Sequence, residues 1–508
     1  MKIRVNKPMR SRNRIVELTS AATMSSPFFN VGVARLVLNC SRRVVALAAI
    51  LAFSACVISS KPLTPAIDIP PAYTASSFSG AAMAESDWWR GFNSDELSSL
   101  IASALRASPD MAIAAERILQ AEAQVRIAGA SLFPAVSSGA GISRRDSHPE
   151  GGPSTSSEST SVTVSASYEL DLWGRNASDA SAAGFTLSAN RFDCETVRLT
   201  LVTGVANAYF QVLSLRGRLA VARENLTIAE RVLGVVEARF RNGAVSPLDV
   251  ARQQTAVLSQ RATIPALELQ ERQTLFALAV LLGRPPQGFD VSGSTVSGLT
   301  VPSAAPGLPA DLLMRRPDLA AAEAQLAAAN ANVAAARAAL FPSIQLTGST
   351  GLASDMLLNV LHSPTASTAV GASLLQPIFD AGRLRSQVDI AKSRERELVE
   401  NYRKSILTAL ADVETALASA SRIEEQERLQ EQVLEQARRV MRIAEIRYRE
   451  GVDDLLSVLD AQRTLFQAED QLAQTRFSRL QASVGFFKAL GGGWQMNLPL
   501  KEASQGLR

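Results

Sequence analysis

Residues 447–463 read RYREGVDDLLSVLDAQR, and residues 239–254, which lie 208 positions earlier, read RFRNGAVSPLDVARQQ. In each segment an Arg-aromatic-Arg triplet closes a long helix-like run, a Gly (Gly243 or Gly451) follows, and a second helix-like run begins at once. Gly is favoured where a chain turns through a left-handed conformation. The two segments therefore predict a helical hairpin that occurs twice in the chain.

The offset of 208 residues extends far beyond these two segments. Four further motif pairs keep it: Pro109-Asp110 with Pro317-Asp318, Leu132-Phe133-Pro134 with Leu340-Phe341-Pro342, Gly174-Arg175 with Gly382-Arg383, and Leu282-Gly283 with Leu490-Gly491. Ala-rich helices resemble one another by chance, but chance does not keep all of these motifs in one register. We therefore predict that the whole chain is a duplication.

The composition indicates long helices rather than a large compact core. The chain has 508 residues, of which only 5% are aromatic and only two are His. Ala, Leu, Gln, Glu and Arg recur at helical spacing instead. This composition is typical of long, narrow helices packed side by side.

The net charge of +4 and the pI near 9.1 do not indicate a nucleic-acid partner. Residues 1–55 hold nine Lys or Arg against the single acid Glu17, a net charge of +8, which leaves −4 for the remainder. The basic balance therefore belongs to a segment that we expect to be removed.

That segment has the pattern of a secretory signal. Two Arg at 42–43 precede ten apolar residues at 44–53, which are too few to span a bilayer as a helix, and then Ser54-Ala55-Cys56. Small residues directly before a Cys resemble the lipobox of bacterial lipoproteins, so we expect cleavage before Cys56 and lipidation of Cys56. The alternative is an ordinary signal peptide cleaved near Ala55, with Cys56 incidental.

Two helical runs are unusually long. No Pro interrupts residues 176–241 or residues 384–450. Each run of about 66 residues would extend roughly 100 Å as one helix. A return helix is predicted after each hairpin turn, the first broken at Pro265 and the second running to about Leu490.

Between residues 161 and 172 the pattern changes, because every even position is apolar and every odd position is polar. Such alternation predicts a β-strand. A weaker partner is predicted at 136–142, across a loop at 144–160. The second half repeats this plan with strands at 344–350 and 369–379 across a loop at 352–367. We therefore predict four strands per chain, each about ten residues long.

The alternating strands fit either a half-buried soluble sheet or tilted membrane strands with lipid outside and water inside. Four strands cannot close a membrane barrel, and open sheet edges do not occur in lipid. The membrane interpretation therefore requires several chains to pool their strands. From the alternation alone both interpretations stay open.

Five motifs occur together and in a fixed order: Asp-Trp-Trp-x-x-Phe from Asp87, Leu-Phe-Pro from Leu132, Leu-Trp-Gly-Arg from Leu172, Leu-Pro-x-Asp-Leu-Leu-x-Arg-Arg-Pro-Asp from Leu308, and Arg-Tyr-x-x-Gly-Val from Arg447. With the lipobox before them, they resemble the outer-membrane efflux lipoproteins of the TolC/OprM family, in the NodT-like branch. The resemblance covers nearly everything from about Cys40 to Gly493.

This resemblance implies an α+β membrane protein. Duplicated long antiparallel helices would form a periplasmic α-barrel, and four strands per chain would contribute to a trimeric, 12-stranded β-barrel in the outer membrane. The implied function is that of a passive exit duct, which takes small molecules or drugs from a periplasmic adaptor and an inner-membrane pump of RND type to the exterior. The implied partners are two further copies of the chain, the adaptor, the pump and outer-membrane lipid.

Leu456, Asp460 and Arg463 occupy positions i, i+4 and i+7 and so project from one helical face. In proteins similar to this chain, matching positions close the periplasmic gate, with a Leu ring and an Asp-to-Arg contact that ties neighbouring helices. Three symmetric copies of Asp460 would repel one another, and Arg463 is the candidate counter-ion. The alternative is an ordinary surface pair on one helix.

The same resemblance implies a contact with the adaptor at the two turns. The matching positions are Arg239, Gly243, Ser246 and Asp249 in the first turn and Arg447 and Gly451 in the second. Gly at these positions also has the simpler interpretation of a turn residue, and both interpretations hold together.

The sequence indicates no enzyme, cofactor or metal. His148 and His362 are isolated, and neither a phosphate-binding loop nor a Cys-His pair is present. The competing hypothesis for the function is a structural or interaction protein, namely a long coiled-coil envelope lipoprotein without a channel.

The expected organisation follows the repeat. It comprises a signal peptide (1–55), a lipid-anchored arm (56–92), a first efflux repeat (93–283, with a β-hairpin at about 135–172), a linker (284–310), a second repeat (311–492, with a β-hairpin at about 344–379) and a tail (493–508).

Overall fold

The computed structural model describes residues 67–74, 86–302, 306–355 and 364–495. Cys56, the predicted signal and His362 lie outside these residues. No helix in these four ranges is both long enough and apolar enough to cross a membrane.

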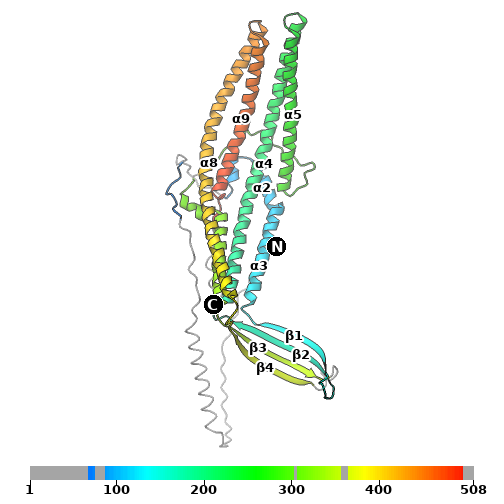
Figure 1. Cartoon of the computed structure of the whole chain (residues 1–508). Helices are drawn as coiled ribbons and strands as arrows, with labels where there is room; N and C mark the ends of the chain where they lie inside the picture. The colour runs from blue at the N-terminus through cyan, green and yellow to red at the C-terminus, as the bar shows by residue number, and fades with distance from the viewer. Residues whose placement is uncertain (1–66, 75–85, 303–305, 356–363, 496–508) are drawn as a thin grey trace, which may run out of the picture. The chain divides into compact units, whose positions relative to one another are not determined.

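The described chain contains the same series of elements twice (Figure 1). The first series is η1 (Trp88–Phe92), α2 (Asp95–Ala107), α3 (Pro109–Ala130), β1 (Ala135–Ser147), β2 (Thr155–Leu170), α4 (Arg175–Arg241) and α5 (Pro247–Leu281). The second series is η2 (Pro309–Asp311), α6 (Leu312–Arg315), α7 (Pro317–Ala338), β3 (Ser343–Ser354), β4 (Thr365–Leu375), α8 (Arg383–Arg449) and α9 (Leu455–Ala489).

The helices of the two series confirm the predicted duplication. The bounds of α3 and α7, of α4 and α8, and of α5 and α9 differ by 208 residues at both ends. Helices α4 and α8 have 67 residues each, which corresponds to about 100 Å. Figure 1 shows α4 with α5 and α8 with α9 as two long hairpins, with the sheet at the opposite end from their turns.

Short sequence signals fix where the long helices begin. Gly174 and Gly382 precede α4 and α8 with φ values of 74° and 85°, a left-handed conformation that glycine adopts without strain. The Ser246 hydroxyl accepts a hydrogen bond from the backbone N–H of Asp249 at the start of α5, and the Asp454 carboxylate accepts one from Ser457 at the start of α9. Such caps satisfy N–H groups that lack a partner in the first turn of a helix.

The predicted break at Pro265 is wrong, because α5 continues through this residue. A proline removes one hydrogen bond and crowds the preceding turn, but α5 is held against α4 at this level. Leu267 packs with Leu215 and Leu219 of α4, and Ile264 packs against the same cluster. Packing on both sides of Pro265 therefore outweighs the local preference of the residue.

The four strands form one antiparallel sheet in the order β1-β2-β3-β4, as the predicted α+β class requires. Strands β1 and β2 have 13 and 16 residues, longer than the predicted ten, and only residues 148–154 separate them. The predicted loop at 144–160 was wrong because its polar residues pair across the strands, as Arg144 does with Glu158. Strand β4 ends at Leu375, not at Phe379, because Pro377 has no N–H for the ladder.

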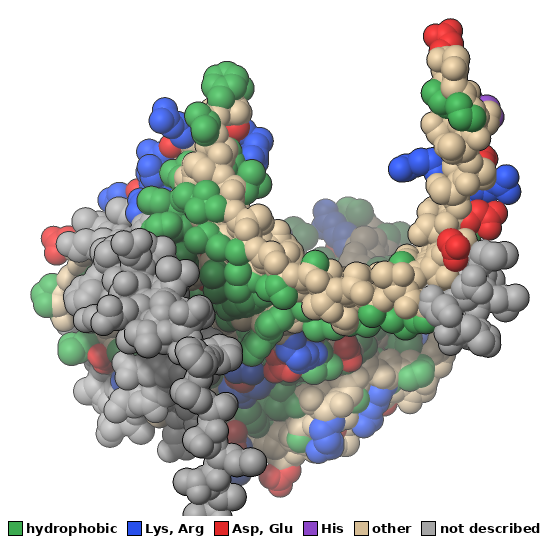
Figure 2. All heavy atoms as spheres, turned by 90° about the horizontal axis from the view of Figure 1, so that it is seen from below, with side chains coloured by type: hydrophobic (Ala, Val, Ile, Leu, Met, Phe, Trp, Pro, Cys, Tyr) green, Lys and Arg blue, Asp and Glu red, His purple; other side chains and the backbone are tan. Residues whose placement is uncertain are grey.

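The sheet exposes apolar side chains that have no cover within the described chain. Val136, Val162, Val164 and Val370 are all exposed, Val370 to 87%. Seen from below the orientation of Figure 1, the described chain has a hollowed face (Figure 2). The tan band that crosses this face consists of backbone and uncharged polar side chains. Large exposed apolar residues on a sheet indicate a surface covered by lipid or by another chain.

The main core joins the two repeats through an aromatic cluster. Trp88 of η1 stacks on Phe487 of α9 at 5.0 Å between ring centroids, and Phe92 lies 4.9 Å from Phe210 of α4. All four side chains are buried. The short segment before α2 therefore holds α4 of the first repeat against α9 of the second.

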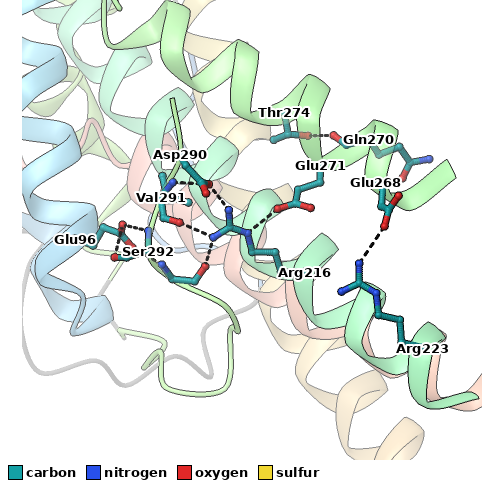
Figure 3. Close-up of polar contacts among 11 residues, drawn as sticks. Glu96, Arg216, Arg223, Glu268, Gln270, Glu271, Thr274, Asp290, Val291 and Ser292 are labelled. Atoms are coloured by element: carbon teal, nitrogen blue, oxygen red, sulfur yellow. Dashed lines mark hydrogen bonds and ion pairs between the residues drawn. The ribbon is translucent and has the colours of Figure 1, made fainter. Parts of the chain in front are cut away.

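The chain that leaves α5 is held by two charged side chains (Figure 3). Arg216 of α4 binds Glu271 at 2.7 Å and Asp290, and it donates hydrogen bonds to the carbonyls of Val291 and Gly293. Glu96 of α2 accepts hydrogen bonds from the backbone N–H groups of Ser292 and Gly293 and from two hydroxyl groups, those of Ser292 and Tyr209. Burial acts to raise the pKa of the Glu96 carboxyl, but these hydrogen bonds outweigh it and hold the pKa below its ordinary value.

Candidate functional site

The candidate site consists of the two hairpin turns, between α4 and α5 and between α8 and α9. One apolar cluster packs the two hairpins together near these turns, and its buried members include Val232 and Val236 of α4, Tyr448 of α8, and Leu455 and Val458 of α9. The residues predicted at the two turns therefore lie at the end of one packed unit.

Arg239 joins the first hairpin to the second. Its Nη1 donates a hydrogen bond to the carbonyl of Tyr448, and its guanidinium carbon lies 4.7 Å from the centroid of the Tyr448 ring. This carbonyl belongs to the last turn of α8, and it also accepts a hydrogen bond from the backbone N–H of Gly451 at 3.1 Å. Tyr448 is only 3% exposed. Arg239 therefore stabilises the contact between the hairpins, whatever else it binds.

Tyr448 was not among the predicted site residues. It stands between two Arg in the segment that defines the repeat, and Phe240 takes the equivalent place in the first copy. The aromatic residue between the two arginines was the signal available in the sequence. The partner of Arg239 was not foreseeable, because it lies 209 residues away in the chain.

Ser246 and Asp249 form a reciprocal cap at the start of α5. The backbone N–H of each residue donates a hydrogen bond to the side chain of the other. The Ser246 hydroxyl also donates to the Asp249 carboxylate at 2.8 Å. The hydrogen bonds from the side chain and then from the backbone of Ser246 lower the pKa of Asp249. These two residues therefore build the turn itself.

The second turn is closed by an ion pair. Arg447 holds Asp453 through two hydrogen bonds of 2.6 and 3.0 Å, and this contact lowers the pKa of the Asp453 carboxyl. Gly243 and Gly451 adopt φ values of 71° and 76°, as the turn interpretation predicted. A Cβ at Gly451 would lie 3.7 Å from Nη2 of Arg239, so the second turn passes close to the first hairpin.

Leu456, Asp460 and Arg463 lie on one face of α9, as their spacing predicted. Asp460 and Arg463 form an ion pair of 2.5 Å within that helix, and both side chains are largely exposed. Leu456 is 50% exposed. Within the chain, the observed contact is the one along a single helix, and the predicted contact between neighbouring helices requires another copy.

Two buried amides lie between the hairpins, and the sequence did not single them out as a pair. Gln253 of α5 and Gln462 of α9 are 0% and 2% exposed. Nε2 of Gln253 donates to the carbonyl of Ala229 at 3.0 Å and lies 3.4 Å from Oε1 of Gln462. These amides tie α5 to α4 and to α9 below the turns.

Within the described residues, no group of His, Cys, Asp or Glu side chains could hold a metal ion. Two long helical hairpins on a four-stranded sheet with an exposed apolar face define the class of outer-membrane channels with a helical extension. The family model of the outer membrane efflux protein matches residues 100–284 and 308–492. The chain therefore belongs to the outer membrane efflux protein family.

Known members of this family cover almost the whole chain. The pyoverdine export outer membrane protein OpmQ of Pseudomonas aeruginosa is 44% identical over 459 residues, which are 88% of this chain and 96% of OpmQ. The solved outer-membrane channel OprN is 28% identical, with a TM-score of 0.81, and covers 87% of this chain and 100% of its own. The open state of the Neisseria gonorrhoeae MtrE outer membrane channel is 29% identical, with a TM-score of 0.78, over 87% of this chain and 99% of its own. By their names, these relatives are an outer-membrane export protein and two outer-membrane channels.

Proposed function

We propose that this chain forms the outer-membrane exit duct of a tripartite efflux system and passes small molecules passively to the exterior. The observation that carries the proposal is the combination of a sheet that exposes an apolar row with two helices, α4 and α8, of about 100 Å each. Membership of the efflux family supports this function and not the alternative of a coiled-coil envelope protein without a channel.

The proposed assembly is a trimer. Strands β1 and β4 are the first and last of the sheet order, so each chain offers two open edges. Open edges do not occur in lipid, and β4 of one copy next to β1 of the following copy would close them. Three copies would pool twelve strands. Light scattering of the detergent-extracted protein tests this assembly, because a monomeric particle contradicts it.

The proposed gate consists of Leu456, Asp460 and Arg463. In a trimer, three exposed Asp460 carboxylates near the axis would repel one another and attract the arginines of neighbouring copies. Replacing Asp460 and Arg463 by Ala should raise the uptake of bulky antibiotics in cells that lack the pump. The matched control replaces Arg422 and Glu425 by Ala, because this exposed pair has the same spacing on α8. Equal uptake in both variants would reject the gate.

The proposed adaptor contact is at the turns, where Arg239, Gly243, Ser246, Asp249, Arg447 and Gly451 lie. No side chain of the described chain would meet a Cβ at Gly243 within 4 Å, so this turn offers bare backbone to a partner. Gly243→Arg should abolish copurification of the periplasmic adaptor. Gly234→Arg is the control, because Gly234 is equally uncrowded but lies within α4. Undiminished copurification of the Gly243 variant would place the contact elsewhere.

The proposed anchor is a lipid on Cys56. Its support is the order of small residues before this Cys. Cys56→Ser should abolish labelling by a fatty-acid analogue, whereas persistent labelling would place the lipid elsewhere.

The proposed cargo is a small exported molecule of the kind that OpmQ, named for pyoverdine export, carries. Expression of this chain in Pseudomonas aeruginosa cells that lack OpmQ tests the cargo directly. Restored pyoverdine export would support it, and unrestored export despite normal outer-membrane levels would exclude it.

A further inference from the structure

Three ion pairs join the helices of each hairpin at corresponding positions, and their signs are opposite in the two hairpins. In the second hairpin Glu427 also pairs with Arg476 and Arg479, without a charged counterpart in the first. In the first hairpin the pairs are Arg216–Glu271 at 2.7 Å, Arg223–Glu268 at 3.0 Å and Glu230–Arg261 at 2.7 Å. In the second hairpin they are Glu424–Arg479 at 3.1 Å, Glu431–Arg476 at 2.9 Å and Arg438–Glu469 at 3.2 Å. Each residue of the second set lies 208 positions after its counterpart in the first, and every charge is reversed. We call these pairs the rungs; Figure 3 shows two of them, at Arg216 and Arg223.

The rungs have the spacing of a coiled coil. On α4 they lie at residues 216, 223 and 230, and on α8 at 424, 431 and 438. Charged positions that recur every seven residues beside a packed seam are the positions that choose partners in coiled coils. The rungs therefore lie where charge selects which helices pair.

The reversal has a definite consequence for incorrect pairing. With α5 on α4 and α9 on α8, all six rungs are attractive. If α9 took the place of α5 on α4, Arg216 would face Arg479, Arg223 would face Arg476 and Glu230 would face Glu469. All three rungs of the other exchanged pair, α5 on α8, would be like-charged too.

An exchange of this kind is within reach of the fold. Helices α4 and α8 have equal lengths, as do α5 and α9, and the apolar spacing follows the same repeat. Helix α9 already lies against α4 through another face, where Arg218 binds Asp470 at 2.6 Å. The incorrect partner is therefore a neighbour of the correct one, within each chain and between copies that assemble.

Stabilisation alone does not explain the reversal. Exposed ion pairs add little to stability, and the rungs at Arg223 and Arg261 are largely exposed. Two hairpins with the same signs would be held equally well. Opposite signs matter only where two similar partners compete.

We propose that the six rungs are a pairing code that assigns α5 to α4 and α9 to α8 as the protein folds and assembles. The code concerns helix pairing and goes beyond export, so it holds or fails independently of the cargo and of the gate. The helices that the code pairs belong to this chain and to its copies.

The test exchanges charges at the two rungs of the first hairpin that lie nearer the turn, Arg223–Glu268 and Glu230–Arg261. The third rung is left unchanged, because Arg216 also holds the chain after α5. The α5-reversed variant carries Arg261→Glu and Glu268→Arg. The fully reversed variant adds Arg223→Glu and Glu230→Arg, which restores attraction within the hairpin but gives it the signs of the second hairpin.

Engineered cysteines report the pairing in a Cys194→Ser background. Nε2 of Gln260 lies 3.5 Å from the carbonyl of Ala222, so cysteines at 222 and 260 face each other across α4 and α5. The equivalent position on α8 is Gln430, so cysteines at 260 and 430 report the exchanged pair. Disulfide products formed in cells are quantified by mass spectrometry.

In the α5-reversed variant the 222–260 product should fall about tenfold relative to the parent, and the 260–430 product should appear. In the fully reversed variant both products should form, because the two exchanged rungs attract α5 to α4 and to α8 alike. The 222–260 product should stay the larger, because Glu271 still pairs with Arg216 of α4. The control Gln270→Arg with Arg272→Gln, which leaves the net charge unchanged at exposed positions of α5, should match the parent.

Two results would overturn the code. The first is a 260–430 product that stays at the level of the parent in both variants, because the rungs would then select nothing. The second is a fully reversed variant that forms only the 222–260 product, because the rungs would then hold the hairpin without distinguishing its partners.

Discussion

Arg239→Ala should loosen the contact between the two hairpins near their turns. The substitution removes a hydrogen bond from a charged donor to the Tyr448 carbonyl and the cation–π contact with the buried Tyr448 ring. A hydrogen bond to a charged group contributes about 1.5–3 kcal/mol, and a partly exposed cation–π contact about 0.5–1 kcal/mol. Because water replaces part of the lost hydrogen bond, we expect a net loss of about 2 kcal/mol, or roughly thirtyfold in an equilibrium between packed and separated turns.

Single-channel recording in planar bilayers measures this change as the fraction of time spent in the high-conductance state. Tyr448→Phe is the matched control, because it keeps both the ring and the carbonyl that Arg239 contacts. The Tyr448 hydroxyl itself has no hydrogen-bond partner in the described chain. An open fraction that is the same in Arg239→Ala and in the parent protein would show that the contact does not restrain the turns, and the reasoning would be refuted.

Three further predictions concern stability. The folded-state pKa of Glu96 is lowered, so the stabilisation by Glu96 is complete above the ordinary carboxyl pKa of 4.5 and is lost as the pH falls through the folded-state pKa. Glu96→Gln should therefore flatten the acid limb of a profile of melting temperature against pH. A profile parallel to that of the parent would contradict this. Gly491→Ala should prevent accumulation of folded protein, because its Cβ would lie 2.0 Å from the Arg315 carbonyl. A Cβ at Gly243 meets no atom within 4 Å, so Gly243→Ala should lower the free energy of unfolding by only about 1 kcal/mol in a urea titration. Equal losses in the two variants would contradict the contact. Trp88→Ala should destabilise the protein by about 3–5 kcal/mol, because the side chain is buried. Circular dichroism should then show loss of helix at a lower temperature than in the parent. An unchanged transition would show that the aromatic cluster is not needed to join the repeats.

The sequence predicted the helices well because their signals are local or repeated. Unbroken helical spacing located α4 and α8, and the 208-residue offset transferred each boundary from one half to the other. The errors fell where distant residues decide. Pro265 stays within α5 because α4 packs beside it, and β1 and β2 extend past the alternating core because their polar ends pair with each other.

The places of the candidate residues on a helix and at the turns were predictable, but their contacts were not. The spacing correctly placed Leu456, Asp460 and Arg463 on one face, and glycine indicated both turns. The bond from Arg239 to Tyr448 depends on how two hairpins pack, which no local pattern encodes. The reversed rungs are different, because the offset and the heptad spacing together make them visible in the sequence once the hairpin register is known.

The equal lengths of corresponding helices, α4 with α8 and α5 with α9, restrict how this chain can change during evolution. One residue inserted into α8 would rotate everything beyond it by about 100° and advance it by about 1.5 Å. Tyr448 would then no longer face Arg239, and any rung beyond the insertion would leave its partner. Within the hairpins, insertions and deletions must come in matched pairs on both helices, and blocks of seven residues disturb the register least.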